Sequence, residues 1–256
     1  MKTRPLLLWL LALIITLASA YYQRATGPTW PLTGTVTLNG REIHYKLPRS
    51  HEGSGKARIS VIAPDTLVFG FVKFAFQDYP GAWRQTAMLR HGDTLVAELP
   101  GQEPLKVMPC QVYLVVRGSS PVLITKDLLK IRFKGYTPRA ALIPHIVFMF
   151  AAMLFSTRAG LETLTGGRRG PTLASWTVVT LFIGGIALGA LVTYYAFHLW
   201  WTGWPVGTDL TDNKTAIALL IWLFAWLRVR KHPRRRVAVI VAAALMLVIF
   251  LIPHSM

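Results

Sequence analysis

Hydrophobic positions along this 256-residue chain fall into long apolar runs and one region of short alternating segments. A bilayer core about 30 Å thick is spanned by roughly 20 helical residues. One run reaches that length alone, and the others reach it with their flanking residues. The pattern predicts a membrane protein with four or five transmembrane helices. The apolar runs are Pro5–Ala20, Ala140–Phe155, Leu173–Trp200, Thr215–Leu227 and Val237–Pro253.

The first run has two interpretations, and the sequence leaves both open. Lys2 and Arg4 precede the run, and Ala18-Ser19-Ala20 ends it, which is the pattern of a cleaved secretory signal peptide. The same residues suit an uncleaved N-terminal signal anchor. Residues 1–20 are therefore a signal peptide or a membrane anchor, and residues 139–256 form a four-helix transmembrane bundle. We expect its helices at about 140–156, 173–200, 213–228 and 236–253.

Between residues 21 and 138, short alternating runs are broken by Gly, Pro, Asn and Asp. Asn39-Gly40 lies between two such runs and predicts a tight β-hairpin, because both turn positions need positive φ. Seven or more short strands in about 110 residues indicate an antiparallel β-sandwich, with a flexible loop at residues 50–56. The expected strands are 35–38, 42–47, 57–62, 68–76, 94–99, 111–116 and 129–133.

Composition and charge place the chain in the membrane and orient it. Hydrophobic residues make up 53% of the chain and charged residues 15%, which excludes an ordinary soluble enzyme. Much of the net charge of +17 gathers in the loops at 156–171 and 228–236. Short basic loops stay in the cytoplasm, so residues 21–138, the 198–214 loop and the C-terminus are expected outside. Basic clusters beside membrane ends indicate anionic lipid headgroups as partners, and no nucleic acid.

Residues 68–116 resemble an immunoglobulin or fibronectin type III-like sandwich. The resemblance rests on Phe71-Val72-Lys73-Phe74, Trp83, Met88, the segment 95–102 and Val112-Tyr113. It implies an immunoglobulin-like fold in which Trp83 and Tyr113 pack between the sheets. The whole chain is similar to bacterial inner-membrane proteins that join such a periplasmic domain to a small helical bundle. Modules of this kind bind proteins or sugars, or act as spacers, so fold alone does not fix function.

Cys110 is the single cysteine of the chain, so the exported domain cannot form an internal disulfide. It lies at the start of an apolar strand. We expect a small core residue here, with a reactive thiol or an interchain bridge as the alternative.

The loop after the third apolar run carries the densest polar chemistry. Trp200, Trp201 and Trp204 suit an aromatic belt at a bilayer surface. Asp209, Asp212, Asn213 and Lys214 follow, just before a helix expected to begin near Thr215. Helix capping would explain Asp212 or Asn213. The second carboxylate and Lys214 have no local explanation, so this segment is a candidate functional loop.

Three histidines are predicted on the same outer side of the bundle as this loop. His145 lies within the second run, whereas His198 and His254 end later runs. Ionisable groups within a membrane suggest function, and His with Asp can bind a metal. No cofactor is predicted, but a metal or haem site involving His145, His198 and His254 stays an alternative.

Small residues and glycines suggest close packing rather than catalysis. Gly185 and Gly189 form a small-xxx-small pair that lets helix backbones approach, within one chain or in a homo-oligomer. The Gly-rich basic segment 166–170 follows a membrane helix instead of a strand, so it predicts a cytoplasmic turn and not a phosphate loop.

Three functions remain open. The first is a non-enzymatic membrane protein whose sandwich and outer loop contact a membrane or periplasmic protein partner, since no catalytic motif is present. The second is solute or ion transport through an oligomeric bundle. The third is a metal- or haem-binding membrane redox or assembly factor. We expect the first.

Overall fold

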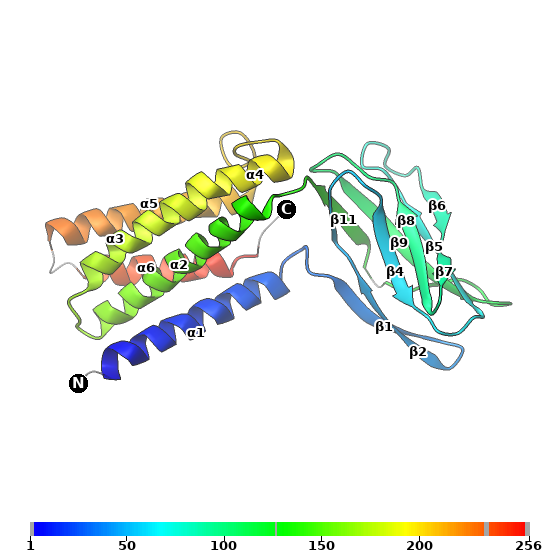
Figure 1. The fold of residues 1–256 in the computed structure, drawn as a ribbon, viewed down its shortest axis with the longest axis horizontal. Helices are drawn as coiled ribbons and strands as arrows, with labels where there is room; N and C mark the ends of the chain where they lie inside the picture. The colour runs from blue at the N-terminus through cyan, green and yellow to red at the C-terminus, as the bar shows by residue number, and fades with distance from the viewer. Residues whose placement is uncertain (1–2, 126, 233–235, 254–256) are drawn as a thin grey trace. The chain divides into compact units, whose positions relative to one another are not determined.

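A computed structural model describes residues 3–125, 127–232 and 236–253 of the chain. The chain divides into two compact units. A β unit spans Thr29–Tyr136, and a helical unit combines Met1–Pro28 with Thr137–Met256. The N-terminal helix thus packs with the C-terminal half of the sequence (Figure 1).

The described residues of the β unit form three mainly antiparallel sheets. One has the strand order β3-β11-β9-β5-β6 with β10 paired to β9, the second has the order β4-β8-β7, and the third is the hairpin β1-β2. The strands are β1 (Leu32–Leu38), β2 (Arg41–Leu47), β3 (Ser50–Glu52), β4 (Ala57–Ile62), β5 (Val68–Phe74), β6 (Arg84–Ala87), β7 (Leu89–His91), β8 (Thr94–Leu99), β9 (Val107–Val116), β10 (Val122–Leu123) and β11 (Leu129–Lys134).

Strand alternation sorts the side chains of the β unit into buried and exposed faces. Asn39 and Gly40 both have positive φ, 51° and 69°, and join β1 to β2 with Leu38 opposite Arg41, so the predicted hairpin is confirmed. Alternate residues of β2, β4, β5, β8, β9 and β11 point into one shared hydrophobic core. Cys110 is a fully buried member of that core, as expected.

Two expectations for the β unit are wrong. Residues 50–56 are not all loop, because β3 pairs in parallel with β11, placing Ser50 opposite Arg132. Main-chain pairing at a sheet edge requires no apolar side chains, so hydropathy did not reveal this strand. Trp83 is 42% exposed and Tyr113 stacks on Phe71 outside the core, so neither packs between sheets.

Within its described residues, the helical unit has four helices long and apolar enough to span a membrane. They are α1 from Pro5 onward, α2, the continuous segment formed by α3, η1 and α4, and α5. Helix α6 is shorter. The bounds are α1 (Thr3–Ala25), α2 (Arg139–Leu164), α3 (Gly170–Leu181), the π-helix η1 (Phe182–Leu188), α4 (Gly189–Phe197), α5 (Leu210–Lys231) and α6 (Val237–Leu251).

Glycines allow the helices to approach closely around η1. A Cβ atom at Gly184 would lie 2.8 Å from Cβ of Phe148 in α2, and one at Gly185 would lie 2.5 Å from Cγ2 of Thr215 in α5. A Cβ at Gly189 would lie 3.8 Å from the His145 ring. Gly185 and Gly189 therefore face neighbouring helices of the same chain.

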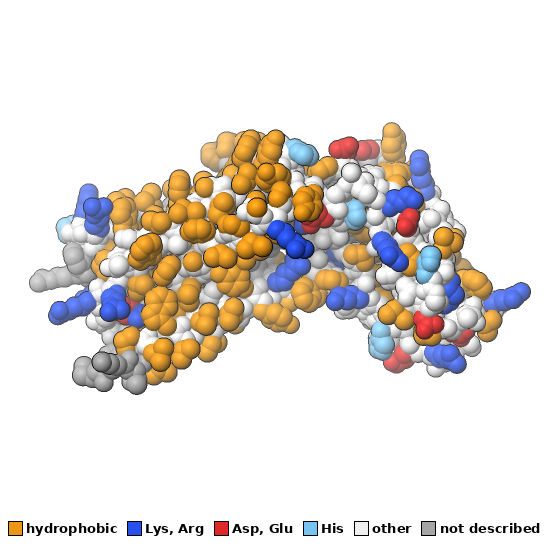
Figure 2. Space-filling view, in the orientation of Figure 1, with side chains coloured by type: hydrophobic (Ala, Val, Ile, Leu, Met, Phe, Trp, Pro, Cys, Tyr) orange, Lys and Arg blue, Asp and Glu red, His pale blue; other side chains and the backbone are white. Residues whose placement is uncertain are grey.

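Chain direction gives the helical unit two ends. We call the end with the α4–α5 loop, residues 198–209, the tryptophan end. We call the opposite end, where α2 joins α3 and α5 joins α6, the arginine end. Lys and Arg side chains gather at the arginine end, whereas the sides of the unit are largely hydrophobic (Figure 2).

The connection at the arginine end is shorter than the predicted 156–171 loop. Helix α2 continues to Leu164, so Arg158 and Glu162 lie within the helix. Hydropathy falls in this last segment because polar side chains are buried there, and the helix itself does not end. Likewise α5 begins at Leu210 and not near Thr215.

Candidate functional site

The polar residues of the tryptophan end form one hydrogen-bonded network around Thr202. Asp209 caps α5: its Oδ1 accepts from the backbone N–H of Thr211 at 2.8 Å. Its Oδ2 accepts from the Thr202 hydroxyl at 3.2 Å. The cap is therefore Asp209, and the expectation of Asp212 or Asn213 is wrong, because the helix starts earlier than its apolar residues suggest.

Asp212 and Asn213 hold the preceding loop from the first turn of α5. Asp212 Oδ2 accepts from the backbone N–H of Thr202 at 2.7 Å and from its hydroxyl at 2.8 Å. Asn213 Oδ1 accepts from the backbone N–H of Trp204 at 2.7 Å. A Cβ atom at Gly203 would lie 2.6 Å from that oxygen. Asp212 and Asn213 thus both hold the loop in place. The sequence did not reveal this local role for a second carboxylate.

Lys214 binds the end of α6. Only 6% of Lys214 is exposed, and its Nζ donates to the Ile252 carbonyl at 2.8 Å. Gln23 of α1 donates to the same carbonyl at 3.3 Å. Carbonyl groups at a helix C-terminus lack intrahelical donors, so a lysine there satisfies one of them. Lys214 therefore joins α5 to the end of α6.

The tryptophans lie on the surface above this network. Trp200 is 59% exposed and stacks on Tyr194, with ring centroids 4.5 Å apart. Trp204 is 77% exposed. Trp201 is half-buried and donates its ring N–H to the Trp204 carbonyl at 3.0 Å. Hydrogen bonds thus hold the loop, while two large aromatic rings remain exposed.

The structure describes two of the three candidate histidines, and these two contact different residues. Half-buried His145 donates its Nδ1–H to the carbonyl of Gly184 in η1 at 2.9 Å. His198 ends α4 in a left-handed conformation, is exposed and lies edge-on to Tyr194. His254 lies outside the described residues. In the part of the chain that the structure describes, no three His, Cys, Asp or Glu side chains are grouped to hold a metal.

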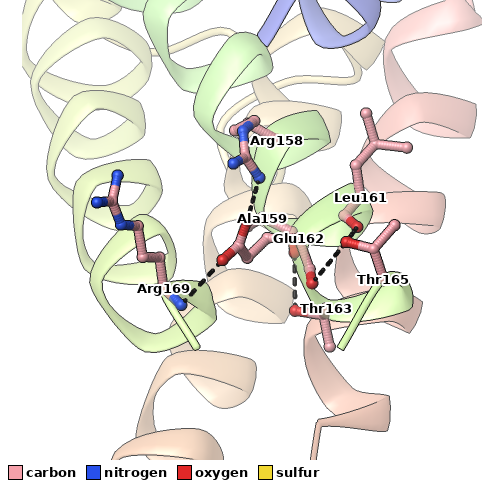
Figure 3. A network of polar contacts seen from close by, with 7 residues as sticks. All are labelled: Arg158, Ala159, Leu161, Glu162, Thr163, Thr165 and Arg169. Carbon is pink, nitrogen blue, oxygen red and sulfur yellow. Dashed lines mark hydrogen bonds and ion pairs between the residues drawn. The ribbon is translucent and has the colours of Figure 1, made fainter. Parts of the chain in front are cut away.

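An ion pair at the arginine end was missed by sequence reasoning. Arg158 Nη1 lies 2.7 Å from Glu162 Oε2, and the two side chains are 2% and 11% exposed. Glu162 Oε1 also accepts from the backbone N–H of Arg169 at 3.2 Å (Figure 3). The guanidinium of Arg158 lies 5.4 Å from the ring centroid of Trp9 in α1. The four-residue spacing of opposite charges at the end of an apolar run was the available signal.

The outward face of one sheet in the β unit is unusually apolar. Phe69 lies opposite Val115 and Phe71 opposite Tyr113 across β5 and β9. Leu123 of β10 continues this row beyond Tyr113. Phe69 is 50% exposed and Leu123 is 40% exposed. We call these five residues the apolar sheet face; its signal in the sequence was apolar residues on both alternating sets of positions in 68–72 and 112–116.

A comparison of the chain with protein-family models and with curated proteins finds no match.

Proposed function

We propose that the chain is a multi-pass protein of the bacterial inner membrane whose β unit is an immunoglobulin-like sandwich on the periplasmic side. In this proposal the protein is not an enzyme. It contacts a membrane or periplasmic protein partner through its β unit and its tryptophan end. The four membrane-length apolar helices support the membrane location. The basic arginine end supports the orientation, because basic loops stay in the cytoplasm.

The apolar sheet face is the observation that carries the interaction proposal. A sheet face open to water normally carries polar side chains, since only the opposite face packs on the core. Here Phe69, Phe71, Tyr113, Val115 and Leu123 take most of those positions, beside the polar pair Lys73 and Gln111. Aromatic residues dominate the energy of protein interfaces, and an exposed apolar patch indicates an interaction surface.

The tryptophan end supports the proposed membrane location. Asp209 and Asp212 accept hydrogen bonds from Thr202 of the loop, and Asn213 accepts one from Trp204 of the loop. These polar groups thus hold the loop in its conformation, while Trp200 and Trp204 remain exposed. In the proposed location these rings lie at the bilayer surface, where amphipathic aromatics are favoured.

Site-specific photo-crosslinking in intact cells tests the sheet face. A photoreactive amino acid at Phe71 should give a discrete crosslinked product, and one at exposed Lys46 of β2 should not. Phe69→Ser with Val115→Ser should lower the yield from position 71 by about 10-fold, because two apolar contacts at an interface are lost. Equal products from positions 71 and 46 would contradict the proposal. Unchanged unfolding temperatures of the purified variants would show that the fold is retained.

Transport stays a second candidate because of one observation. A π-helical turn interrupts the longest apolar helix, and the half-buried His145 binds the Gly184 carbonyl of that turn. Single π-turns within helices occur often at functional sites. Solute uptake by proteoliposomes that is lost in His145→Ala would favour transport over partner binding.

A further inference from the structure

A pocket of about 260 Å³ opens at the arginine end, between the ends of four helices of the helical unit. Arg168 and Arg236 line it, one from the α2–α3 connection and one from the start of α6. Thr163 adds a hydroxyl-bearing side chain to the lining, and Gly167 and Gly170 add backbone. Its remaining walls are apolar and come from Pro171, Val229 and Val239.

The charge balance around this pocket is strongly positive. Only Glu162, Asp209 and Asp212 of the chain's 11 acidic residues belong to the helical unit, and the two aspartates lie at the tryptophan end. Glu162 is already paired with Arg158. No described acidic side chain forms an ion pair with Arg168 or Arg236, since the other ion pairs found all lie in the β unit.

The buried ion pair fixes the wall of the pocket that carries Arg168. Gly167 packs directly on the carboxylate of Glu162, where a Cβ atom would collide with Oε1. The same oxygen binds the backbone N–H of Arg169. Glu162 is held in turn by Arg158 (Figure 3). Glu162 therefore holds the Gly-rich segment 166–170 in place, and Arg168 belongs to this fixed segment.

The lining selects a phosphate group attached to an apolar body. An arginine side chain can donate two parallel hydrogen bonds to phosphate oxygens. The two positive charges of the arginines exceed the single negative charge of a phosphodiester. The three apolar walls would contact the glycerol and first methylenes of a lipid. Basic pockets between helices on the cytoplasmic side are suited to anionic headgroups.

We propose that this pocket binds the headgroup phosphate of an anionic phospholipid from the adjacent membrane leaflet, with Arg168 and Arg236 as its phosphate ligands. The inference rests on the proposed membrane location of the helical unit, but on no protein partner. It goes beyond general attraction of basic loops to lipid, because it assigns a bounded site to two arginines among many. Arg228 and Arg230 lie at the same end without lining the pocket, and their guanidinium groups lie over Phe224 and Trp226.

Thermal unfolding of the purified full chain in neutral detergent tests the site. Phosphatidylglycerol added to the micelles should raise the unfolding temperature of the wild type, because a ligand of the folded state stabilises it. Phosphatidylcholine should not. Arg168→Gln with Arg236→Gln should weaken the apparent affinity for phosphatidylglycerol at least about 10-fold. The matched pair Arg228→Gln with Arg230→Gln removes the same charge at the same end and should respond like the wild type.

Each other outcome overturns the inference. Equal losses in both variant pairs would mean diffuse attraction without a site. Equal stabilisation by sodium phosphate would mean a free-anion site and no lipid headgroup. If the glutamine pair does not fold, Arg168→Lys with Arg236→Lys keeps the charge but loses the two-pronged geometry, and an affinity equal to that of the wild type would contradict phosphate ligation. Variants of the apolar sheet face should leave this lipid response unchanged, so failure here is separable from failure of partner binding.

Discussion

Thr202 shows at the scale of single residues how the tryptophan end is built. Its backbone N–H and its hydroxyl both bind Asp212, and the hydroxyl also lies within hydrogen-bond distance of Asp209. Both carboxylates of the predicted functional loop therefore bind the same threonine. Their chemistry is that of helix capping and loop fastening.

Asp212→Ala should destabilise the protein through this network. The substitution leaves the half-buried N–H of Thr202 without its acceptor, which typically costs about 1–3 kcal/mol. Thermal unfolding in detergent should show a lower midpoint, and proteases should cleave the 198–209 loop faster. Thr208→Ala, at an exposed position of the same loop, is the control and should behave like the wild type. A normal midpoint for Asp212→Ala would show that the loop does not depend on this carboxylate.

At the scale of elements, the end of α2 depends on a charge pair that lies almost out of water. Removing one partner of a buried pair leaves an uncompensated charge and typically costs about 3–5 kcal/mol, whereas replacing both partners with apolar residues can be nearly neutral. Arg158→Met alone should therefore lower the unfolding midpoint strongly. Arg158→Met with Glu162→Met should recover much of that loss.

The comparison of these two variants is made by thermal unfolding with Arg228→Met as the control, because Arg228 is exposed near the same end. The recovery is expected to be incomplete, since Glu162 also binds the backbone N–H of Arg169. A double variant destabilised more than Arg158→Met alone would instead indicate that Glu162 stabilises the helix independently of Arg158.

Elements were more predictable from the sequence than contacts were. The Asn39-Gly40 turn and the alternating strands have a local cause, so sequence patterns reveal them. The edge strand β3 has none, because its pairing with β11 is formed by main-chain groups far apart in the sequence. The end of α2 was misjudged for a related reason: Arg158 and Glu162 look like loop residues until the helices that bury them are known. The assignment of the α5 cap to Asp209 likewise required the loop geometry.

At the scale of the whole molecule, the proposed orientation can be tested by labelling introduced cysteines, because the chain's own cysteine is expected not to react. Burial raises the pKa of Cys110 to about 12, so the thiolate that reacts with maleimides is scarce near neutral pH. An impermeant maleimide should therefore label native protein only at introduced cysteines. Ser119→Cys in the β unit should be labelled on intact spheroplasts, and Lys231→Cys at the arginine end only after lysis.

Labelling of Lys231→Cys before lysis would reverse the proposed orientation. The unsubstituted chain is the control, with Cys110 reacting only after denaturation.

The overall charge asymmetry was visible in the sequence because it depends only on where basic residues occur along the chain. The pocket between Arg168 and Arg236 was not, since it depends on which helix ends are neighbours.

The π-turn of η1 has a consequence for how the chain could vary. Gly184 accepts both the backbone N–H of Gly189, five residues on, and the ring of His145. In a regular α-helix the partner would lie four residues on, so the wide turn accommodates one surplus residue between two helical segments. A homologue one residue shorter in 182–188 would keep both segments in phase. It would have a narrower turn whose carbonyl is redirected along the helix axis, and selection to keep the histidine should then be relaxed at position 145.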